Sequence, residues 1–331
     1  MISSLAAMVQ VCLRRSRASW PIVGAAGLIC VLASALMAAG PMYAGAVSIA
    51  GLHRVLADAP TTDANIAVSF RVDPAAWEAA DMAVRDALDR AVGRVGGVVD
   101  AYGRSDSFEL PGRPAGDRTD LVTVGFADGI EEHADLVDGA WPAPDGGAGQ
   151  PVDVAISEEV AGRLGLSVGT DLRLVSRATD GFSVPARIGA TFRIRDPADP
   201  FWWAEPQVID GLVTSERFAT HGPLFTSRSA FLAHAAPGRT QVGWRAFPRP
   251  DGFQLRDIET VRTGVTGLER RLEASLGGTS VTVETGLPAI LEETDRSLLV
   301  SRAGVLLLTA QFVVLAAYAV LLSAALLVEH R

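Results

Sequence analysis

The sequence predicts an α+β domain placed between two transmembrane α-helices. The 331-residue chain carries charge-free apolar stretches near both of its ends, which is typical of membrane spans. Between these stretches, strand-like alternation and helix-like periodicity follow one another, as in mixed domains of helices and strands. Hydrophobic residues make up 49% of the chain and charged residues 20%, so a disordered chain is excluded.

The first apolar stretch has no charged side chain from Ala18 to Leu52, and its most apolar part runs from Trp20 to Gly40. About 20 helical residues are enough to cross a hydrocarbon core of about 30 Å. We therefore expect a transmembrane helix over residues 18–45.

A cleaved signal peptide is the alternative interpretation of this stretch. Arg14, Arg15 and Arg17 would form its positively charged region, and Ala44-Gly45-Ala46 would be its cleavage site. The apolar run is longer than the usual core of a signal peptide, which has about 7–15 residues. That length favours a helix that is retained.

The second apolar stretch runs from Ala303 to Val328, and Gln311 is its one strongly polar residue. A charge at the middle of a span costs about 2.5–3.5 kcal/mol on insertion scales, so a charge-free run of this length is typical of a membrane helix. We expect a transmembrane helix over residues 303–328. The helical pattern before it is unbroken, so residues 287–302 are expected to form a stalk continuous with the span.

The charges predict an orientation in a cell membrane. The tail of residues 1–17 has three arginines and no acidic residue, so we expect it in the cytoplasm. Two spans then return residues 329–331 to the cytoplasm and leave residues 46–302 outside it. From His53 to Arg302 there are 25 arginines against 37 acidic residues, a net charge of −12. Because such a surface repels phosphates, nucleic-acid binding is excluded.

The first half of this extracytoplasmic domain begins with a predicted β-α-β unit. Apolar residues alternate over 66–72, which predicts a half-buried strand. Asp73-Pro74 is typical of a helix N-cap followed by a first-turn proline, and the helix is expected to reach about Val92. Residues 121–126 are expected to be the next strand.

A mainly β inserted subdomain is predicted over about residues 150–235. It begins with a strand at 152–156, after which Ser157 caps a short helix that Gly165 ends. Two antiparallel strands are expected to follow, at 172–175 and 188–194.

The last third of the domain returns to alternating elements. The sequence predicts a strand at 241–247, a helix at 255–276 and a further strand at 280–284. The stalk follows directly after this last strand.

Several chemistries are excluded by residues that are missing. All 29 basic residues are arginine, so the lysines of a Walker A loop, a protein kinase and a pyridoxal phosphate enzyme are absent. The two cysteines, Cys12 and Cys30, lie near the N-terminus. The extracytoplasmic domain therefore has no disulfide and no paired-cysteine zinc site.

No catalytic constellation is recognisable in the rest of the chain. There is no Gly-x-Ser-x-Gly elbow and no His-Glu-x-x-His motif. The domain's histidines, which lack the spacing of a helical metal pair, are His53, His133, His221 and His234. We predict no catalytic residue, no metal ligand and no cofactor, and we do not expect an enzyme.

Two other features have an ordinary structural interpretation beside a functional one. Carboxylates are adjacent at 131–132, 158–159 and 292–293, where solvated helix faces explain them and a glycosidase pair would need opposite walls of a cleft. The aromatic cluster Phe201-Trp202-Trp203 is typical of core packing, although it could line an apolar groove or contact lipid or a partner.

Four motifs follow one another at Asp138–Pro142, Val152–Thr170, Phe192–Trp202 and Leu326–Arg331. They are a G-x-W-P loop before a strand, an S-E-x-x-A-x-x-L-G-L-x-V-G helix-turn, an F-R-x-R-D-P-x-D-P-[FY]-W run and the end of the second span. In this order the motifs resemble the FtsX/MacB-like family of ABC-transporter permeases, in its actinobacterial form, whose cytoplasmic coupling segment begins at that last point.

The resemblance implies a membrane permease subunit that couples a separate cytoplasmic ABC ATPase to movement of the extracytoplasmic domain. It also implies a dimer of permeases in the lipid bilayer. Members of the family continue with further spans beyond this point, so the resemblance implies that the chain is a truncated permease. It does not identify the exported substrate.

A two-span sensor is the alternative function. Receptors of this kind also hold a ligand-binding domain between two membrane helices. A charged signalling module after Arg331 would favour the sensor, and further membrane spans would favour the permease.

Overall fold

The computed structural model describes residues 20–111, 118–144, 151–203, 205–236 and 238–329. The chain divides into two compact units, which we call the sheet unit (Val55–Leu291) and the helical unit (Met1–Arg54 with Glu292–Arg331). The predicted cytoplasmic tail, residues 1–17, lies outside the described residues, as do residues 330–331.

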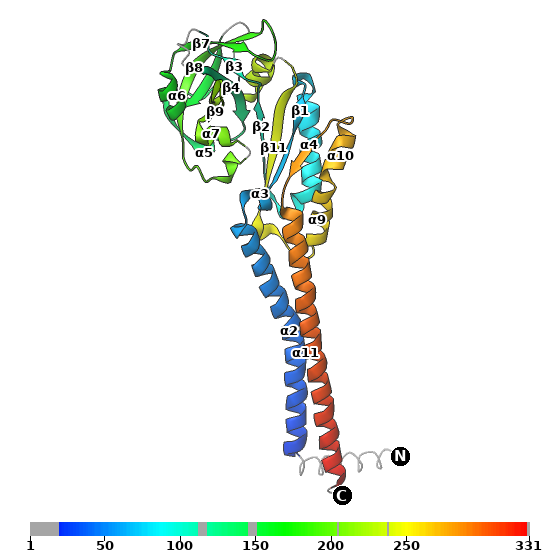
Figure 1. Ribbon diagram of the computed structural model, residues 1–331. Coiled ribbons are helices and arrows are strands. Elements are labelled where there is room, and N and C mark those ends of the chain that lie inside the picture. The colour runs from blue at the N-terminus through cyan, green and yellow to red at the C-terminus, as the bar shows by residue number, and fades with distance from the viewer. Residues whose placement is uncertain (1–19, 112–117, 145–150, 204, 237, 330–331) are drawn as a thin grey trace. The chain divides into compact units, whose positions relative to one another are not determined.

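The sheet unit contains all of the described strands (Figure 1). The strands are β1 (Ile66–Val72), β2 (Gly97–Arg104), β3 (Phe108–Glu109), β4 (Thr119–Ala127), β5 (Ala134–Gly139), β6 (Val152–Ser157), β7 (Asp171–Ser176), β8 (Ser183–Ile194), β9 (Leu212–Thr214), β10 (Phe218–Phe225), β11 (Thr240–Pro248) and β12 (Thr282–Glu284). Its α-helices are α3 (Thr61–Ala64), α4 (Trp77–Val92), α5 (Ile130–His133), α6 (Glu158–Leu164), α7 (Pro206–Asp210), α8 (Arg228–Ala230), α9 (Ile258–Thr266) and α10 (Leu268–Ser275).

Five strands form an open sheet in the order β12-β1-β11-β2-β4, with antiparallel neighbours throughout. Helix α4 packs on one face of this sheet, together with α9 and α10. The Trp77 ring on α4 stacks on Trp244 of β11 with centroids 5.3 Å apart, and Trp244 also stacks on Phe70 of β1 at 5.2 Å. Side chains alternate along a strand, so the neighbours of Trp244 and Phe70 face away from the helices.

A second group of strands closes into a ring. Strand β4 pairs with β3 on one side and with β10 on the other, and the path continues β3-β7-β8-β6-β10. Strand β4 therefore belongs both to the open sheet and to this six-stranded barrel, while β5 pairs with β8 outside the ring. The barrel draws on β3 and β4, which precede the inserted region of 150–235 that the sequence suggests.

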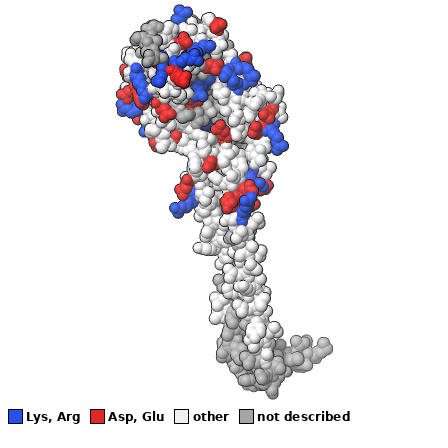
Figure 2. Space-filling model, in the orientation of Figure 1, with Lys and Arg blue, Asp and Glu red and all other residues white. Residues whose placement is uncertain are grey.

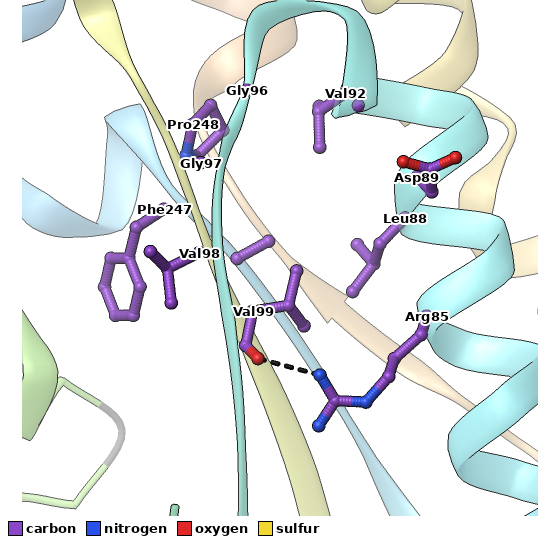
Figure 3. A pocket seen from close by; sticks show the side chains of 12 residues that line it. Arg85, Leu88, Asp89, Val92, Gly96, Gly97, Val98, Val99, Phe247 and Pro248 are labelled. Atoms are coloured by element: carbon purple, nitrogen blue, oxygen red, sulfur yellow. Dashed lines mark hydrogen bonds between the residues drawn. The ribbon is translucent and has the colours of Figure 1, made fainter. Parts of the chain in front are cut away.

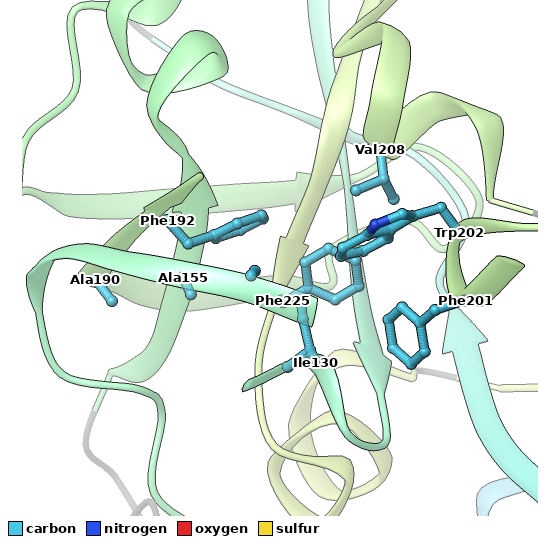
Figure 4. Packing of buried hydrophobic residues seen from close by; sticks show 9 residues of the cluster. Ile130, Ala155, Ala190, Phe192, Phe201, Trp202, Val208 and Phe225 are labelled. Atoms are coloured by element: carbon cyan, nitrogen blue, oxygen red, sulfur yellow. The ribbon is translucent and has the colours of Figure 1, made fainter. Parts of the chain in front are cut away.

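The barrel has its own aromatic core (Figure 4). Phe192 and Phe225 meet with ring centroids 5.9 Å apart, and Phe201 packs edge-on against Trp202 at 4.9 Å. All four side chains are buried. Burying a large aromatic or aliphatic side chain stabilises a fold by about 1.5–3 kcal/mol, so this cluster is a major source of the barrel's stability.

Two sequence predictions about these elements are corrected by the structure. The strand that completes the β-α-β unit is β2, which runs parallel to β1 because both are antiparallel to β11 between them. The predicted partner, 121–126, lies in β4 and runs the opposite way. The single helix predicted over 255–276 is divided into α9 and α10 at Gly267.

The helical unit is formed by most of α2 (Trp20–Asp58) and most of α11 (Leu287–Glu329). Residues 55–58 of α2 and 287–291 of α11 are counted with the sheet unit. A Cβ atom placed at Gly40 of α2 would lie 3.7 Å from Val305 of α11, so the two helices are in contact. Among the described residues, one helix is long and apolar enough to cross a membrane, over Leu287–Tyr318. Figure 2 shows acidic and basic side chains interspersed over the visible face of the sheet unit.

Candidate functional site

A polar cavity of about 490 Å³ lies on the face of the open sheet away from α4. Strand alternation explains why: Val68 and Phe70 of β1 pack toward the helices, which turns Ser69 and Arg71 to the other face. Tyr102 of β2 lies opposite Gly243 of β11 in the sheet and faces the same way. A Cβ atom at Gly243 would lie 2.3 Å from the Tyr102 ring, so a larger residue there would displace the ring.

Glu205 is the buried carboxylate of this cavity, with 5% of its surface exposed. It enters from the segment before α7, and its Oε2 lies 3.5 Å from Nη1 of Arg104 on β2. The same Arg104 nitrogen donates to Oε1 of Gln207 at 3.2 Å. Burial raises the pKa of Glu205, and the nearby guanidinium groups of Arg104 and Arg245 only partly offset that rise.

Arg245 lies beneath the cavity as a buried cation with 1% of its surface exposed. Its Nη1 donates to the backbone carbonyls of Phe201 and Trp203, the latter at 3.3 Å. Its guanidinium lies 4.4 Å from the Phe201 ring centroid and 4.9 Å from that of Tyr102. Burial lowers the pKa of Arg245. The Nε and Nη2 atoms have no hydrogen-bond partner within the part of the chain that the structure describes.

The phenol of Tyr102 lies in the same environment. Burial, and then the negative charge of Glu205, raise the pKa of Tyr102 to about 12. The phenol therefore stays protonated and keeps a hydrogen that it can donate. Together, Tyr102 and Arg104 on β2 and Glu205 before α7 give the cavity donors and an acceptor.

A second, smaller pocket of about 280 Å³ lies between the C-terminal half of α4 and strands β2 and β11 (Figure 3). Its lining is mainly aliphatic and includes Leu88 and Val92. Nη1 of Arg85 donates to the carbonyl oxygen of Val99 at 2.9 Å across it. The pocket beside α4 carries few groups that could orient a polar ligand. The polar cavity of about 490 Å³ is therefore the stronger candidate for a binding site.

The two chain connections at the base of the sheet unit are joined to each other. The backbone N–H of Gly286, between β12 and α11, donates to the carbonyl of Thr62 in α3 at 3.1 Å. The Thr285 hydroxyl accepts from the N–H of Leu287 at 3.2 Å, which caps the start of α11. Leu287 and Leu291, in the first turns of this helix, are fully buried in the sheet unit.

The aromatic cluster of the sequence divides between two environments. Phe201 and Trp202 are 2% exposed and belong to the barrel core. Trp203 is half-buried and borders a shallow groove with Pro197 and Ile209. Core packing is therefore the structural role of the first two residues.

The histidines lie in separate places. Nδ1 of His133 is 2.7 Å from Asp199, and its ring stacks on Phe201 at 4.0 Å. Nε2 of His221 is 3.0 Å from Asp120. No cluster of three or more His, Cys, Asp or Glu side chains that could hold a metal occurs among the described residues.

Two of the three adjacent carboxylate pairs, 158–159 and 292–293, take part in ion pairs on exposed surfaces. Glu158 binds Arg193 at 2.6 Å and Glu159 binds Arg163 at 2.5 Å, and Glu292 binds Arg296 at 2.6 Å. Exposed pairs of this kind contribute about 0–1 kcal/mol each. They do not form opposite walls of a cleft.

Tyr102, Glu205 and Arg245 are functional candidates that no sequence motif singled out. One signal was present for Arg245, which is a single charge within the apolar strand segment 242–247 next to Trp244. In a strand whose one face is covered by helices, such a charge marks the opposite face. No sequence pattern indicates that Glu205, about 40 residues earlier in the chain, would lie above it.

Comparisons with known proteins place few constraints on the chain. No family model matches it, and no curated protein matches it. Among solved structures, it is similar to a domain of a protein named as a permease, from Porphyromonas gingivalis. The identity is 13% and the TM-score is 0.32, and the match covers 69% of this chain and 90% of the other.

Proposed function

We propose that the chain is the membrane-anchored part of an FtsX/MacB-like ABC-transporter permease, which couples a separate cytoplasmic ATPase to movement of the sheet unit. The observation that carries this proposal is helix α11. It runs unbroken from Leu287 to Glu329, and its segment Leu287–Tyr318 is long and apolar enough to cross a membrane. One continuous helix can transmit displacement, whereas a flexible linker would absorb it.

The start of α11 supports this role. Leu287 and Leu291 are buried in the sheet unit, and the adjoining Gly286 is hydrogen-bonded to the segment that follows α2. A movement of α11 along its axis would therefore act on the residues packed around its first turns. The segment 287–302 is the proposed stalk, and 303–328 is the proposed membrane span.

The proposed topology has two spans, at 18–45 and 303–328, with both termini in the cytoplasm. Residues 46–302 would then lie outside the cell membrane. Their net negative charge and the charge-free helix α2 between Trp20 and Leu52 support this arrangement. The proposed partners are an ABC ATPase subunit, a second permease and the lipid bilayer.

An insertion in the stalk tests the coupling. The variant carries a Gly-Gly-Ser-Gly insert directly before Ala303 of the full-length permease, which is reconstituted with its ATPase. The insert should abolish the ATP-dependent movement of spin labels on the sheet unit. ATP hydrolysis should continue. The matched control carries the same insert between Gly277 and Gly278, a turn outside the stalk where added atoms meet open space. Label movement that persists with the stalk insert would contradict the proposal.

A two-span receptor is the second candidate, and the polar cavity on the sheet favours it. A receptor needs a ligand site in its extracytoplasmic domain, which this cavity provides in size and chemistry. An ATPase that copurifies with the full-length protein, and whose hydrolysis rate the protein changes, would distinguish the permease from the receptor.

A further inference from the structure

The cavity above Arg245 presents side chains and very little free main chain. It is built on β1, β2 and β11, whose backbone groups pair with one another across the sheet. A peptide that adds a strand needs unpaired backbone groups at a sheet edge, which this face does not offer. A ligand here must therefore be recognised by hydroxyl, amide, carboxylate and guanidinium groups.

The charges of the cavity are nearly balanced. Its lining holds the cations Arg71 and Arg104 against the anions Asp106, Glu205 and Glu284. Both cations are already engaged, because Arg71 binds Asp106 at 2.9 Å and Arg104 lies beside Glu205. Neither cation of the described lining is therefore free to hold a phosphate or a carboxylate, so an anionic ligand would be unfavourable against this wall.

Apolar ligands are also disfavoured. Ala67 is the one aliphatic residue in the lining, so a lipid chain would bury little apolar surface. An acyl chain or a drug-like hydrocarbon gains its affinity from such burial. The chemistry of the wall therefore suits a neutral, polar molecule.

Several polar groups of the wall have hydrogen-bonding capacity left over. The hydroxyl of Tyr102 and the side-chain amide of Gln241 make no hydrogen bond with any residue that the structure describes. Tyr102 is 6% exposed and Gln241 is half-buried, so both groups lie inside the cavity's walls and not in open solvent. Gln207 accepts from Arg104 through its oxygen, which leaves its NH₂ group as a donor.

We propose that this cavity binds a neutral, hydroxyl-rich ligand of the saccharide class. A sugar hydroxyl both donates and accepts, so it needs an acceptor and a donor close together. Glu205 supplies acceptor oxygens beside the donors Arg104 and Gln207, and Tyr102 and Gln241 supply further groups on the sheet. The volume of about 490 Å³ lies within the range of small-molecule sites, about 300–1,000 Å³.

The inference does not depend on coupling to an ATPase, because a receptor or a permease could bind such a ligand. The test uses the whole chain in amphipol, since glycoside detergents would themselves compete for the site. Cellobiose, maltose and N,N′-diacetylchitobiose are the neutral probes, and glucose 6-phosphate and spermidine are the charged comparators. Binding is measured by saturation-transfer NMR and calorimetry.

Two variants remove one hydrogen-bonding group each. Tyr102→Phe and Gln241→Ala should each weaken the binding of the neutral sugar by about tenfold, the factor expected for one lost hydrogen bond. The matched controls are Tyr318→Phe, an exposed tyrosine on α11, and Gln254→Ala, an exposed glutamine outside the cavity. Both controls should bind as the unaltered chain does.

The outcomes separate clearly. Saturable binding of a neutral sugar that Tyr102→Phe weakens and Tyr318→Phe leaves unchanged supports the proposal. Failure of the unaltered chain to bind any of the three neutral sugars overturns it, as does tighter binding of either charged comparator. Equal binding by Tyr102→Phe and Tyr318→Phe also overturns it, and Tyr102→Phe should retain its fold because its hydroxyl has no described partner to lose.

Discussion

Gly286 and Thr62 join the two connections at the base of the sheet unit through one backbone hydrogen bond of 3.1 Å. They are more than 200 residues apart in the chain, yet one lies just before α11 and the other lies shortly after α2. The contact is close because Gly286 has no side chain. A Cβ atom there would lie 2.9 Å from both Cα and Cβ of Asp63.

Gly286→Ala should therefore destabilise the sheet unit by about 1–3 kcal/mol, the usual cost of overpacking a site that cannot relax. The measurement is urea unfolding followed by circular dichroism. Gly162→Ala in α6 is the control, because a Cβ atom there meets nothing within 4 Å and alanine favours a helix. If the two variants unfold at the same urea concentration, the close approach of Gly286 to Asp63 is not real.

The indole N–H of Trp244 provides the next prediction. It donates to Oδ1 of Asp81 on α4 at 2.7 Å, and the Trp244 side chain is fully buried. Asp81→Ala should cost about 1–3 kcal/mol of stability, because the buried donor is left unpaired. Unfolding is followed by tryptophan fluorescence. Asp86→Ala, which removes an exposed ion pair with Arg90 on the same helix, should cost about 0–1 kcal/mol.

If Asp81→Ala and Asp86→Ala lose the same amount of stability, the Asp81–Trp244 hydrogen bond does not link the helix to the sheet. Asp81→Asn separates charge from hydrogen bonding, because the amide oxygen can still accept from the indole. It should recover most of the stability that Asp81→Ala loses.

Glu205 predicts a pH dependence with a definite sign. Burial raises its folded pKa above the ordinary value of 4.5, so ionisation opposes folding as pH rises from 4.5 through the folded pKa. Glu205→Gln removes this opposition. The stability of the variant relative to the unaltered chain should therefore increase from pH 4.5 to pH 7.5, as measured by urea unfolding at a series of pH values.

Glu259→Gln is the control of opposite sign. The hydrogen bond with Arg262 lowers the pKa of Glu259, so the ionised side chain stabilises the fold above pH 4.5. This stabilisation is lost as pH falls through the folded pKa. Relative to the unaltered chain, this variant should lose stability as pH rises from below the folded pKa of Glu259 to about 4.5 and should change little above that, and the loss is small because the group is exposed. If the stability difference between Glu205→Gln and the unaltered chain does not change between pH 4.5 and pH 7.5, the raised pKa of Glu205 is contradicted.

Local signals in the sequence predicted several elements well. Strand 66–72 is found as β1, and the short helix between Ser157 and Gly165 is found as α6. In α6 the Ser157 hydroxyl accepts from the N–H of Val160 at 3.3 Å, and Gly165 adopts the left-handed conformation that ends the helix. These elements are determined by neighbours in sequence, so they can be recognised there.

Strand β10 shows what sequence patterns miss. It contains Gly222 and Pro223, which argue against a strand, yet it pairs in parallel with β4 and accommodates them at an irregularity between His221 and Leu224. The polar cavity was missed for a related reason. Its residues come from β1, β2, β11 and the segment before α7, and only the closure of the barrel brings Glu205 to that face.

The location of the sheet unit relative to the membrane tests the account most directly. Because the native cysteines are Cys12 and Cys30, a chain with both replaced by serine can carry one reporter cysteine at the exposed Ala178. In intact cells, a membrane-impermeant maleimide should label Ala178→Cys at once, and should label Glu329→Cys at the end of α11 only after permeabilisation. Labelling of Ala178→Cys only after permeabilisation would contradict an extracytoplasmic sheet unit and the coupling proposed for it.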